Sequence, residues 1–276
     1  MGNLVSGVSK HECFGLRKAK QRKRINILIP MAGEGSRFAN VGYVKPKPLI
    51  EIDGKAMIKW VCENLDTADF EPHYIFVIRR AHDEKYGIAT ELKKQAQFVE
   101  VAYAEELTEG PACTCLLAKH LFNTSDPLFI CNSDQYIEWD ASDFFRAMTS
   151  ETKPVDGGIV TFFIPKEKND TKWSYAATDK DGYVTDCQEK KVISEQATVG
   201  YYYFSKGTDF IELAEEMIAA NIRVKNEFYV CPVYNQGVAK KSQIHLLRLQ
   251  KNVGARCSRR CQDFPQRLPG LGSGEN

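Results

Sequence analysis

Long apolar runs are missing from this chain of 276 residues. A membrane-spanning helix needs ~18 or more consecutive apolar residues, and no stretch approaches that length, so we expect no membrane span. The N-terminus also lacks the apolar core of a secretory signal, which argues against secretion. Hydrophobic residues still make up 43% of the chain, enough for one large domain, and we expect a cytoplasmic protein.

An excess of charge of one sign is missing as well. The chain has 37 Lys and Arg residues against 36 Asp and Glu residues, a formal net charge of +1. Nucleic-acid-binding proteins usually carry a strongly basic surface, so the balance argues against that class. Only the basic run at residues 17–24 favours it, and no other feature of the sequence supports nucleic acid as a partner.

The cysteines do not form a disulfide framework. There are nine of them, an odd number, and most lie in apolar runs, as expected of buried thiols in a reducing compartment. Cys113 with Cys115, and Cys257 with Cys261, each resemble half of a zinc site. Because no second Cys or His pair lies at zinc-site spacing around either, we do not expect zinc.

The two ends of the chain differ in composition from the middle. Residues 1–24 end in the basic run, and the simplest interpretation is a solvated, disordered extension. The first six residues also fit the N-myristoylation pattern, with Gly2 as the acceptor. One acyl chain beside a basic patch can hold a protein on an acidic membrane, so peripheral membrane contact stays open. Residues 251–276 lack periodicity, and we expect a disordered tail.

Between these ends, residues 25–250 are expected to form one domain in which strands and helices alternate. This rhythm predicts an α/β fold of three layers, with a doubly wound, mostly parallel, Rossmann-like sheet. Apolar segments predict strands at 25–30, 49–52, 74–78, 98–103, 127–131, 157–163, 174–178, 184–188 and 199–204. Helical spacing predicts helices at 56–66, 84–95, 112–121 and 209–221.

A glycine-rich loop follows the first strand, within Pro30-Met-Ala-Gly-Glu-Gly-Ser-Arg-Phe38. Glycines after a buried strand let backbone N–H groups close around a phosphate chain, and Arg37 adds a planar donor for phosphate oxygens. The loop lacks the third glycine of a dinucleotide fingerprint, and no Gly-Lys-Ser/Thr follows it as in a P-loop. An ordinary tight turn is the alternative.

A second motif follows at Lys45-Pro-Lys-Pro-Leu49. Prolines on both sides of Lys47 stiffen its backbone and prevent a helix there. A lysine on a stiff loop near a triphosphate can stabilise the charge that develops on phosphorus and on departing pyrophosphate. A surface loop with two solvated lysines is the alternative.

Together, the two motifs resemble the sugar-phosphate nucleotidyltransferase family, which includes glucose-1-phosphate thymidylyltransferases and uridylyltransferases. The resemblance covers roughly residues 25–235. It implies that the second half of the domain is β-rich and binds sugar. It also implies a Mg²⁺-dependent reaction of a nucleoside triphosphate with a sugar 1-phosphate, giving a nucleotide sugar and pyrophosphate. Relatives are often dimers or tetramers, so a homo-oligomer is a further expectation.

The resemblance also assigns roles to single residues. It implies catalytic roles for Arg37 and Lys47. It implies nucleotide binding by Ala32, Gly33, Gly35 and Gly110. It implies binding of the sugar phosphate by Glu189, Lys190 and Gly200. For Gly110 a helix-start glycine is the alternative, and for Glu189 with Lys190 the alternative is a surface ion pair.

Asp134 is the expected metal ligand, on the resemblance and on a separate physical argument. It follows an apolar strand, at the edge where a parallel sheet binds ligands, and Mg²⁺ prefers carboxylates with phosphate oxygens. An aspartate capping a turn is the alternative. Many relatives have a second metal-binding aspartate, which residues 226–235 lack, so Glu227 is the nearest replacement.

Two rival functions remain open at this point. The acceptor phosphate could be phosphocholine, with CTP as the donor, although Glu189, Lys190 and Gly200 favour a sugar. The chain could also be a regulatory subunit that binds nucleotide sugars without turnover. Such subunits commonly lose the lysine or the metal aspartate, and both Lys47 and Asp134 are present here.

Overall fold

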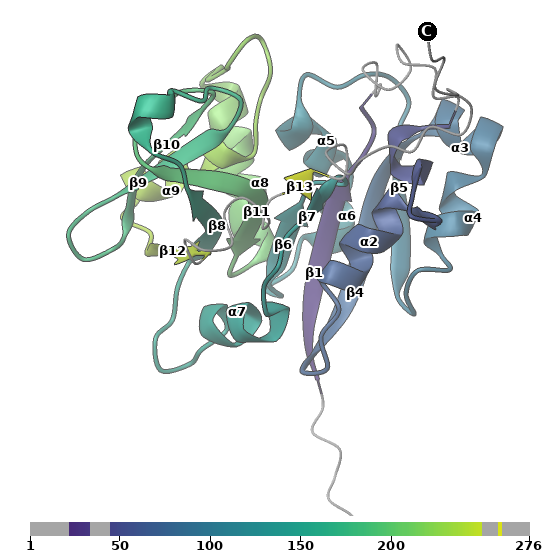
Figure 1. Ribbon diagram of the computed structural model, residues 1–276, viewed down its shortest axis with the longest axis horizontal. Coiled ribbons are helices and arrows are strands. Elements are labelled where there is room, and N and C mark those ends of the chain that lie inside the picture. The colour runs from purple at the N-terminus through teal and green to yellow at the C-terminus, as the bar shows by residue number, and fades with distance from the viewer. Residues whose placement is uncertain (1–21, 34–44, 250–258, 261–276) are drawn as a thin grey trace, which may run out of the picture.

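The fold was obtained as a computed structural model, which describes residues 22–33, 45–249 and 259–260 (Figure 1). The predictions for Gly2, Gly35 and Arg37, and for the basic run up to residue 21, therefore fall outside the described residues. The same holds for the tail from residue 250 onward, apart from the two-residue strand β13 (Arg259–Arg260).

Four parallel strands form the first half of the main sheet, in the spatial order β6-β1-β4-β5. Their interiors are almost wholly buried, as expected for parallel strands covered on both faces. The bounds are β1 Lys23–Pro30, β4 Phe70–Arg79, β5 Val99–Ala104 and β6 Leu128–Cys131. All four correspond to predicted strands, so the doubly wound α/β fold is confirmed.

Helices cover both faces of these strands, which gives the three expected layers (Figure 1). In β1, Ile27 and Ile29 pack with α2 on one face, while Leu28 packs with α5 on the other. The helices are α2 Met57–Asn64, α3 Arg80–Tyr86, α4 Ile88–Leu92, α5 Pro111–Leu117, α6 Lys119–Phe122, α7 Ala141–Met148, α8 Gly207–Ala219 and α9 Tyr234–Ala239. Within the described ranges, none of them has the length and apolarity that a membrane crossing requires.

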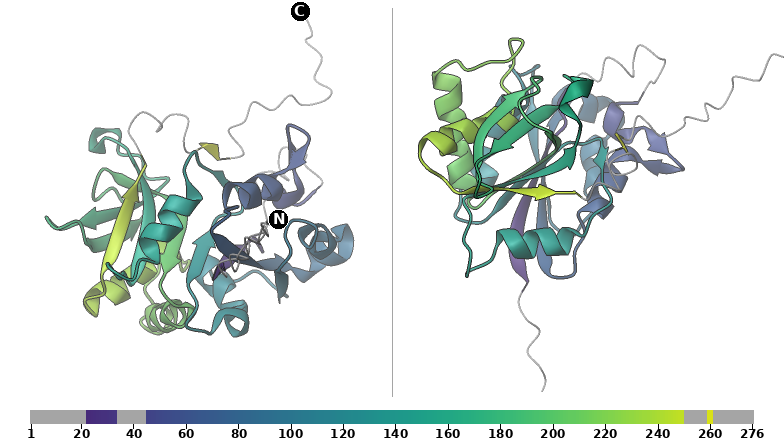
Figure 2. Two further views of the ribbon diagram at one scale, coloured as in Figure 1. Left: turned by 90° about the horizontal axis from the view of Figure 1, so that it is seen from below. Right: turned by 60° about the vertical axis from the view of Figure 1, so that its left-hand side comes forward.

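The second half extends the same sheet with antiparallel strands. β11 pairs antiparallel with β6, and β8, β9 and β10 continue from it. β12 runs parallel to β8 at the outer edge, a strand that the sequence pattern did not reveal (Figure 2). The bounds are β8 Gly157–Phe163, β9 Ser174–Thr178, β10 Val184–Glu189, β11 Gln196–Phe204 and β12 Ile244–Arg248.

The remaining elements are short. Two small pairings lie outside the main sheet, between β2 and β3 and between β7 and β13. Their bounds are β2 Glu51–Ile52, β3 Lys55–Ala56 and β7 Gln135–Tyr136. The single-turn 3-10 helices are η1 Lys47–Leu49, η2 Lys166–Lys168 and η3 Cys231–Val233.

The predicted helix over 84–95 is wrong as a single element. Gly87 adopts a left-handed conformation with φ of +64° and divides the segment into α3 and α4. Its backbone N–H donates to the carbonyl of Asp83 at 2.7 Å, which closes α3 with a C-terminal cap. Helical spacing continues across the glycine, so periodicity alone did not reveal the break.

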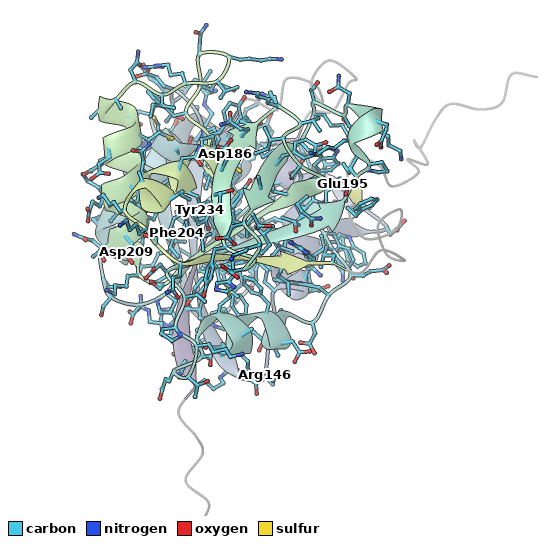
Figure 3. All side chains as sticks on the ribbon, turned by 90° about the vertical axis from the view of Figure 1, so that its left-hand side faces the viewer. Arg146, Asp186, Glu195, Phe204, Asp209 and Tyr234 are labelled. Atoms are coloured by element: carbon cyan, nitrogen blue, oxygen red, sulfur yellow. The ribbon has the colours of Figure 1, made fainter. Side chains whose placement is uncertain are left out.

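Aromatic packing in the second half holds β8, β11 and α9 together. Tyr234 stacks on Phe204 with ring centroids 4.6 Å apart, and Figure 3 shows the two side chains side by side. The buried Tyr234 hydroxyl donates to the carbonyl oxygens of Gly158 and Tyr203, so its polar end is satisfied. This packing supports β10, whose last residue, Glu189, lies in the site described below.

The described cysteines carry free thiols, and most of them are buried. Burial raises the pKa of the Cys62 thiol to about 12, so that thiol stays protonated and unreactive near neutral pH. In the part of the chain that the structure describes, no three His, Cys, Asp or Glu side chains are grouped as a metal site would require.

Candidate active site

The site lies where the sheet changes direction. From β1 the chain builds β4 and β5 on one side and then returns to add β6 on the other side. The carboxyl ends of β1 and β6 therefore lie next to each other at the switch point, where open α/β sheets bind ligands. Ala32 and Gly33 follow β1 and Asp134 follows β6, so the glycine-rich loop and the expected metal ligand begin at the same crevice.

Lys47 and Asp134 meet across this crevice. The Lys47 ammonium donates to Oδ2 of Asp134 at 2.5 Å, although 87 residues separate them in the chain. Pro46 and Pro48 hold Lys47 in the 3-10 turn η1, and the Pro48 side chain is buried. Asp134 is only 8% exposed. The pair thus places one cation and one carboxylate at the carboxyl end of β6.

Aromatic packing positions the segment that carries Asp134. Phe129, in the middle of β6, contacts Phe144 and Phe145 of α7, with ring centroids 5.6 Å and 5.2 Å away. It also contacts Trp139 and Tyr201. Because α7 is anchored to β6 in this way, the chain between them, residues 132–140, is held at both ends over the crevice. The sequence analysis missed α7.

Glu189 and Lys190 lie at the end of β10, on the other side of the crevice. Glu189 is buried, 9% exposed, and accepts a hydrogen bond from the Ser174 hydroxyl on the neighbouring β9. The Lys190 ammonium lies 4.0 Å from the Glu189 carboxylate. The alternative of an exposed surface ion pair is therefore wrong, because the carboxylate is inside the protein.

Tyr229 connects Lys190 to Glu227. The Lys190 ammonium donates to the Tyr229 hydroxyl, which in turn donates to the Glu227 carboxylate. The same ammonium lies 4.3 Å from the centroid of the Tyr229 ring, a cation–π contact. Burial and the hydrogen bond to Glu227 raise the pKa of Tyr229, so its hydroxyl keeps the proton that it donates. Sequence reasoning missed Tyr229, although it lies two residues after Glu227.

These contacts bear on the expected metal ligands. The contact found for the Glu227 side chain is with Tyr229, on the Lys190 side of the crevice. Asp134 offers the carboxylate that Mg²⁺ prefers, beside the loops expected to hold phosphates. No third carboxylate or histidine completes a cluster within the described residues. The donor set therefore fits an ion that takes one or two protein ligands and completes its shell with phosphate oxygens and water.

Gly200 has a positive φ and lies against the side chain of Asn132. It has φ of +81° at an irregularity of β11, and a Cβ there would lie 2.0 Å from the side-chain nitrogen of Asn132. The Asn132 backbone N–H donates to the Gly200 carbonyl at 3.3 Å. A side chain at this position would be strained by the positive φ and would force the Asn132 side chain to move.

Gly110 joins the two halves of the site. It precedes α5 as its N-cap with φ of +130°, which agrees with a helix-start glycine. A Cβ there would lie 2.5 Å from the backbone N and O of Phe228. Phe228 donates its N–H to the Glu109 carbonyl at 2.8 Å and accepts from the Ala112 N–H at 3.0 Å. The close contact with Phe228 gives this glycine a structural role, whether or not it also contacts a base.

A cavity of about 110 Å³ lies between β6, β9, β10 and β11. It opens beside the carboxyl end of β1, and Glu189 and Gly200, two of the residues expected to bind sugar phosphate, line it. Its other lining side chains include Gln135, Lys172, Trp173, Ser174 and Tyr202. Gln135 and Lys172 were not identified from the sequence, although Gln135 directly follows Asp134.

On the role that the resemblance implies for Lys190, binding of the sugar phosphate, we expect Tyr229→Phe to weaken binding of this acceptor without changing nucleotide binding. The substitution removes the hydroxyl that holds the Lys190 ammonium but keeps the ring under it. One hydrogen bond to a charged group corresponds to about a tenfold change. Steady-state kinetics should show the KM for the phosphate acceptor rising about tenfold, with the KM for the triphosphate unchanged. Equal changes in both KM values would contradict a role restricted to Lys190.

Comparison with known proteins gives two kinds of match. The sequence profile of the family described as Nucleotidyl transferase matches residues 27–228. A protein named mannose-1-phosphate guanylyltransferase catalytic subunit beta, from Dictyostelium discoideum, is 24% identical over 66% of this chain and 50% of its own length. A protein of the same name from Drosophila melanogaster is 26% identical over 71% of this chain and 52% of its own length. The chain therefore spans about half the length of these curated relatives.

Solved structures agree on the fold. The crystal structure of a nucleoside-diphosphate-sugar pyrophosphorylase from Vibrio cholerae has a TM-score of 0.64 and 23% identity, covering 81% of this chain and 91% of that chain. A structure from Bacillus anthracis, named as a glucose-1-phosphate thymidylyltransferase, has the same TM-score of 0.64 at 14% identity, covering 84% of this chain and 92% of that chain. At these identities the likeness concerns the fold alone.

Proposed function

Because this chain belongs to the nucleotidyl transferase family, we propose that it condenses a nucleoside triphosphate with a sugar 1-phosphate to give a nucleotide sugar and pyrophosphate. The observation that carries the proposal is the Lys47–Asp134 pair at the switch point, directly before Gln135, which lines a cavity together with Glu189 and Gly200. A cation and a carboxylate beside the expected phosphate loop suit phosphoryl chemistry, while the buried carboxylate in the cavity suits hydroxyl groups.

In the proposed reaction, an oxygen of the sugar phosphate attacks the α-phosphorus of the triphosphate, and pyrophosphate leaves from the opposite side. Ala32, Gly33, Gly35 and Gly110 would hold the nucleotide. Lys47, together with Arg37, would stabilise the negative charge that develops on the phosphates. Catalysis of this kind consists mainly of positioning and charge stabilisation, so no covalent intermediate on the protein is needed.

The acceptor would be held from the opposite side of the crevice. Lys190, oriented by Tyr229, would bind the phosphate of the sugar, and Glu189 would accept a hydrogen bond from a sugar hydroxyl. Gly200, which lines the cavity, would let the sugar ring approach the strand backbone. Asp134, with Glu227 as the second candidate, would hold Mg²⁺. The ion, when bound, would neutralise charge on the triphosphate.

The test is pyrophosphate release with Mg²⁺, measured over a grid of five nucleoside triphosphates against sugar 1-phosphates. GTP with mannose 1-phosphate is the first pair to try, because two relatives carry that activity in their names. Phosphocholine with CTP belongs in the grid as the rival acceptor. Release with one sugar 1-phosphate supports the proposal. Release with phosphocholine alone, or nucleotide-sugar binding without any release, overturns it.

Peripheral membrane attachment is a separate proposal that rests on Gly2 and the basic run. Intact-mass measurement of the protein expressed in eukaryotic cells should show one myristoyl group, which Gly2→Ala should abolish. If Gly2 is unmodified, the basic run remains as the feature that could bind a membrane. Electrostatic attraction by itself gives weaker, salt-sensitive membrane contact.

A further inference from the structure

Gln135 presents a buried hydrogen-bond donor that nothing in the described part of the chain uses. The residue is 1% exposed, and its Nε2 has no hydrogen-bond partner among the described residues. Buried polar groups are nearly always paired, since leaving one unpaired costs its desolvation free energy. An unpaired donor in a candidate ligand cavity therefore points to a partner that arrives with the ligand.

Gln135 is one of several buried polar residues that line the cavity. Gln135 lines it together with Ser174, Thr198 and Tyr202. Those three already have partners: Ser174 donates to Glu189, and the hydroxyls of Thr198 and Tyr202 lie 3.0 Å apart. Among these four buried lining residues, Gln135 is the one whose side-chain nitrogen has no hydrogen-bond partner in the described part of the chain, while the bond between Thr198 and Tyr202 uses one of their two hydroxyl hydrogens. The Gln135 amide can thus donate to a ligand oxygen while the hydrogen bonds among the other lining residues stay as they are.

The backbone of Gln135 is held in place by β11. The buried Tyr201 hydroxyl donates to the Gln135 carbonyl at 2.8 Å, and Gln135 begins the strand β7. The backbone from which this lining side chain extends is therefore fixed at the cavity wall.

The charge inside the cavity favours a hydroxyl over a phosphate as the partner. Glu189 contributes a buried carboxylate, which would repel a phosphate dianion at close range. Lys172, the cation in the lining, pairs with Asp170 at 3.2 Å and lies mostly exposed. Lys190 and Lys47, the cations assigned to phosphates, are not among the residues that line the cavity.

We propose that Gln135 is a specificity-determining residue of the acceptor site, whose Nε2 donates a hydrogen bond to one hydroxyl oxygen of the sugar ring. The proposal rests on the proposed function. It adds that the enzyme distinguishes sugars by the hydroxyl at a single ring position. A site built to hydrogen-bond a hydroxyl discriminates strongly against an analogue that lacks it, because its own polar group is left unpaired.

The test compares Gln135→Met with the wild-type protein. Methionine has a similar length and no donor. With the pair of substrates found in the grid, the KM for the sugar 1-phosphate should rise about tenfold or more, and the KM for the triphosphate should stay within about twofold. Asn26→Leu is the matched control, because its buried amide nitrogen also lacks a partner among the described residues but lies outside the cavity.

A series of monodeoxy sugar 1-phosphates identifies the hydroxyl. In the wild-type protein one deoxy position should lose about tenfold or more in kcat/KM, and in Gln135→Met that loss should shrink toward onefold, since the two changes remove the same bond. Equal losses in both proteins at every position would overturn the proposal. A rise confined to the KM for the triphosphate would also overturn it, by placing Gln135 at the nucleotide.

Calorimetric binding keeps this test independent of turnover. Nucleotide sugars and their monodeoxy analogues can be titrated into the wild-type protein and into Gln135→Met. A protein that binds nucleotide sugars without releasing pyrophosphate would contradict the proposed reaction. A loss of affinity for one monodeoxy analogue would still support the role of Gln135 in sugar recognition. Identical affinities of the two proteins for all analogues would exclude Gln135 from sugar recognition even in an active enzyme.

Discussion

Replacing Lys47 with alanine is expected to lower kcat for pyrophosphate release by about 10²- to 10³-fold, the usual effect of removing one preorganised donor to developing charge. The substitution removes the ammonium that contacts Asp134 at the switch point and leaves the stiff Pro46–Pro48 turn in place. Nucleotide binding should weaken far less, because the glycine-rich loop and Gly110, which we propose to hold the nucleotide, are untouched. Single-turnover kinetics, with nucleotide affinity measured by calorimetry, would separate the two effects.

Lys45→Ala is the matched control for this prediction. Lys45 lies two residues away on the same loop, but its side chain is largely exposed and pairs with Glu51 at 3.1 Å. Exposed ion pairs contribute little, so its loss should leave kcat within about twofold. Comparable losses in the two variants would indicate that the loop needs positive charge in general. In that case the Lys47–Asp134 geometry would have no special role.

Gly110→Ala is expected to lower the free energy of unfolding by about 3 kcal/mol or more. Its φ of +130° strains any residue with a Cβ, and the added carbon would lie 2.5 Å from the backbone of Phe228, which is hydrogen-bonded to Glu109 and Ala112. The displaced segment carries Tyr229 and Glu227, so acceptor binding should weaken as well. Urea denaturation followed by circular dichroism measures the first effect, and the KM for the acceptor measures the second.

Gly182→Ala is the control that separates the effect of backbone strain at a positive φ from the effect of the clash between the added Cβ and Phe228. Gly182 has φ of +90° in the turn between β9 and β10, but open space surrounds the position that a Cβ would take. We expect a loss of about 1–2 kcal/mol there, from strain alone. If Gly110→Ala proved no more destabilising than Gly182→Ala, the contact with Phe228 would not be the reason for the glycine. Nucleotide binding would then be the remaining explanation.

Much of the fold could be predicted because its signals are local. The parallel strands are continuous apolar runs, so β1, β4, β5 and β6 appeared within a few residues of their observed bounds. The break at Gly87 and the strand β12 were missed for a common reason. A helical period continues across a single glycine, and a short edge strand such as 244–248 has no distinctive pattern apart from the strand that it pairs with.

The residues of the candidate site also divide into those that the sequence indicated and those that it did not. Lys47 was identified from its motif and Asp134 from the apolar strand before it, while Glu189 and Lys190 were identified from the resemblance to the nucleotidyltransferase family. Gln135 and Tyr229 were not found, since a neutral amide and a phenol carry no such signal. Their importance comes from what surrounds them: a cavity without an acceptor for Gln135, and an ammonium above the ring of Tyr229.

The sequence by itself determined the order of most strands and helices, the place of the glycine-rich and Lys-Pro-Lys-Pro loops, and the carboxylate after β6, because residue type and periodicity act over a few neighbours. Only the tertiary structure decided that Lys47 meets Asp134, that Gly110 must pack against Phe228, and that Tyr229 lies under Lys190. These contacts depend on strand order and on which backbones approach closely. Both are set by packing between segments far apart in the chain, and no local pattern encodes them.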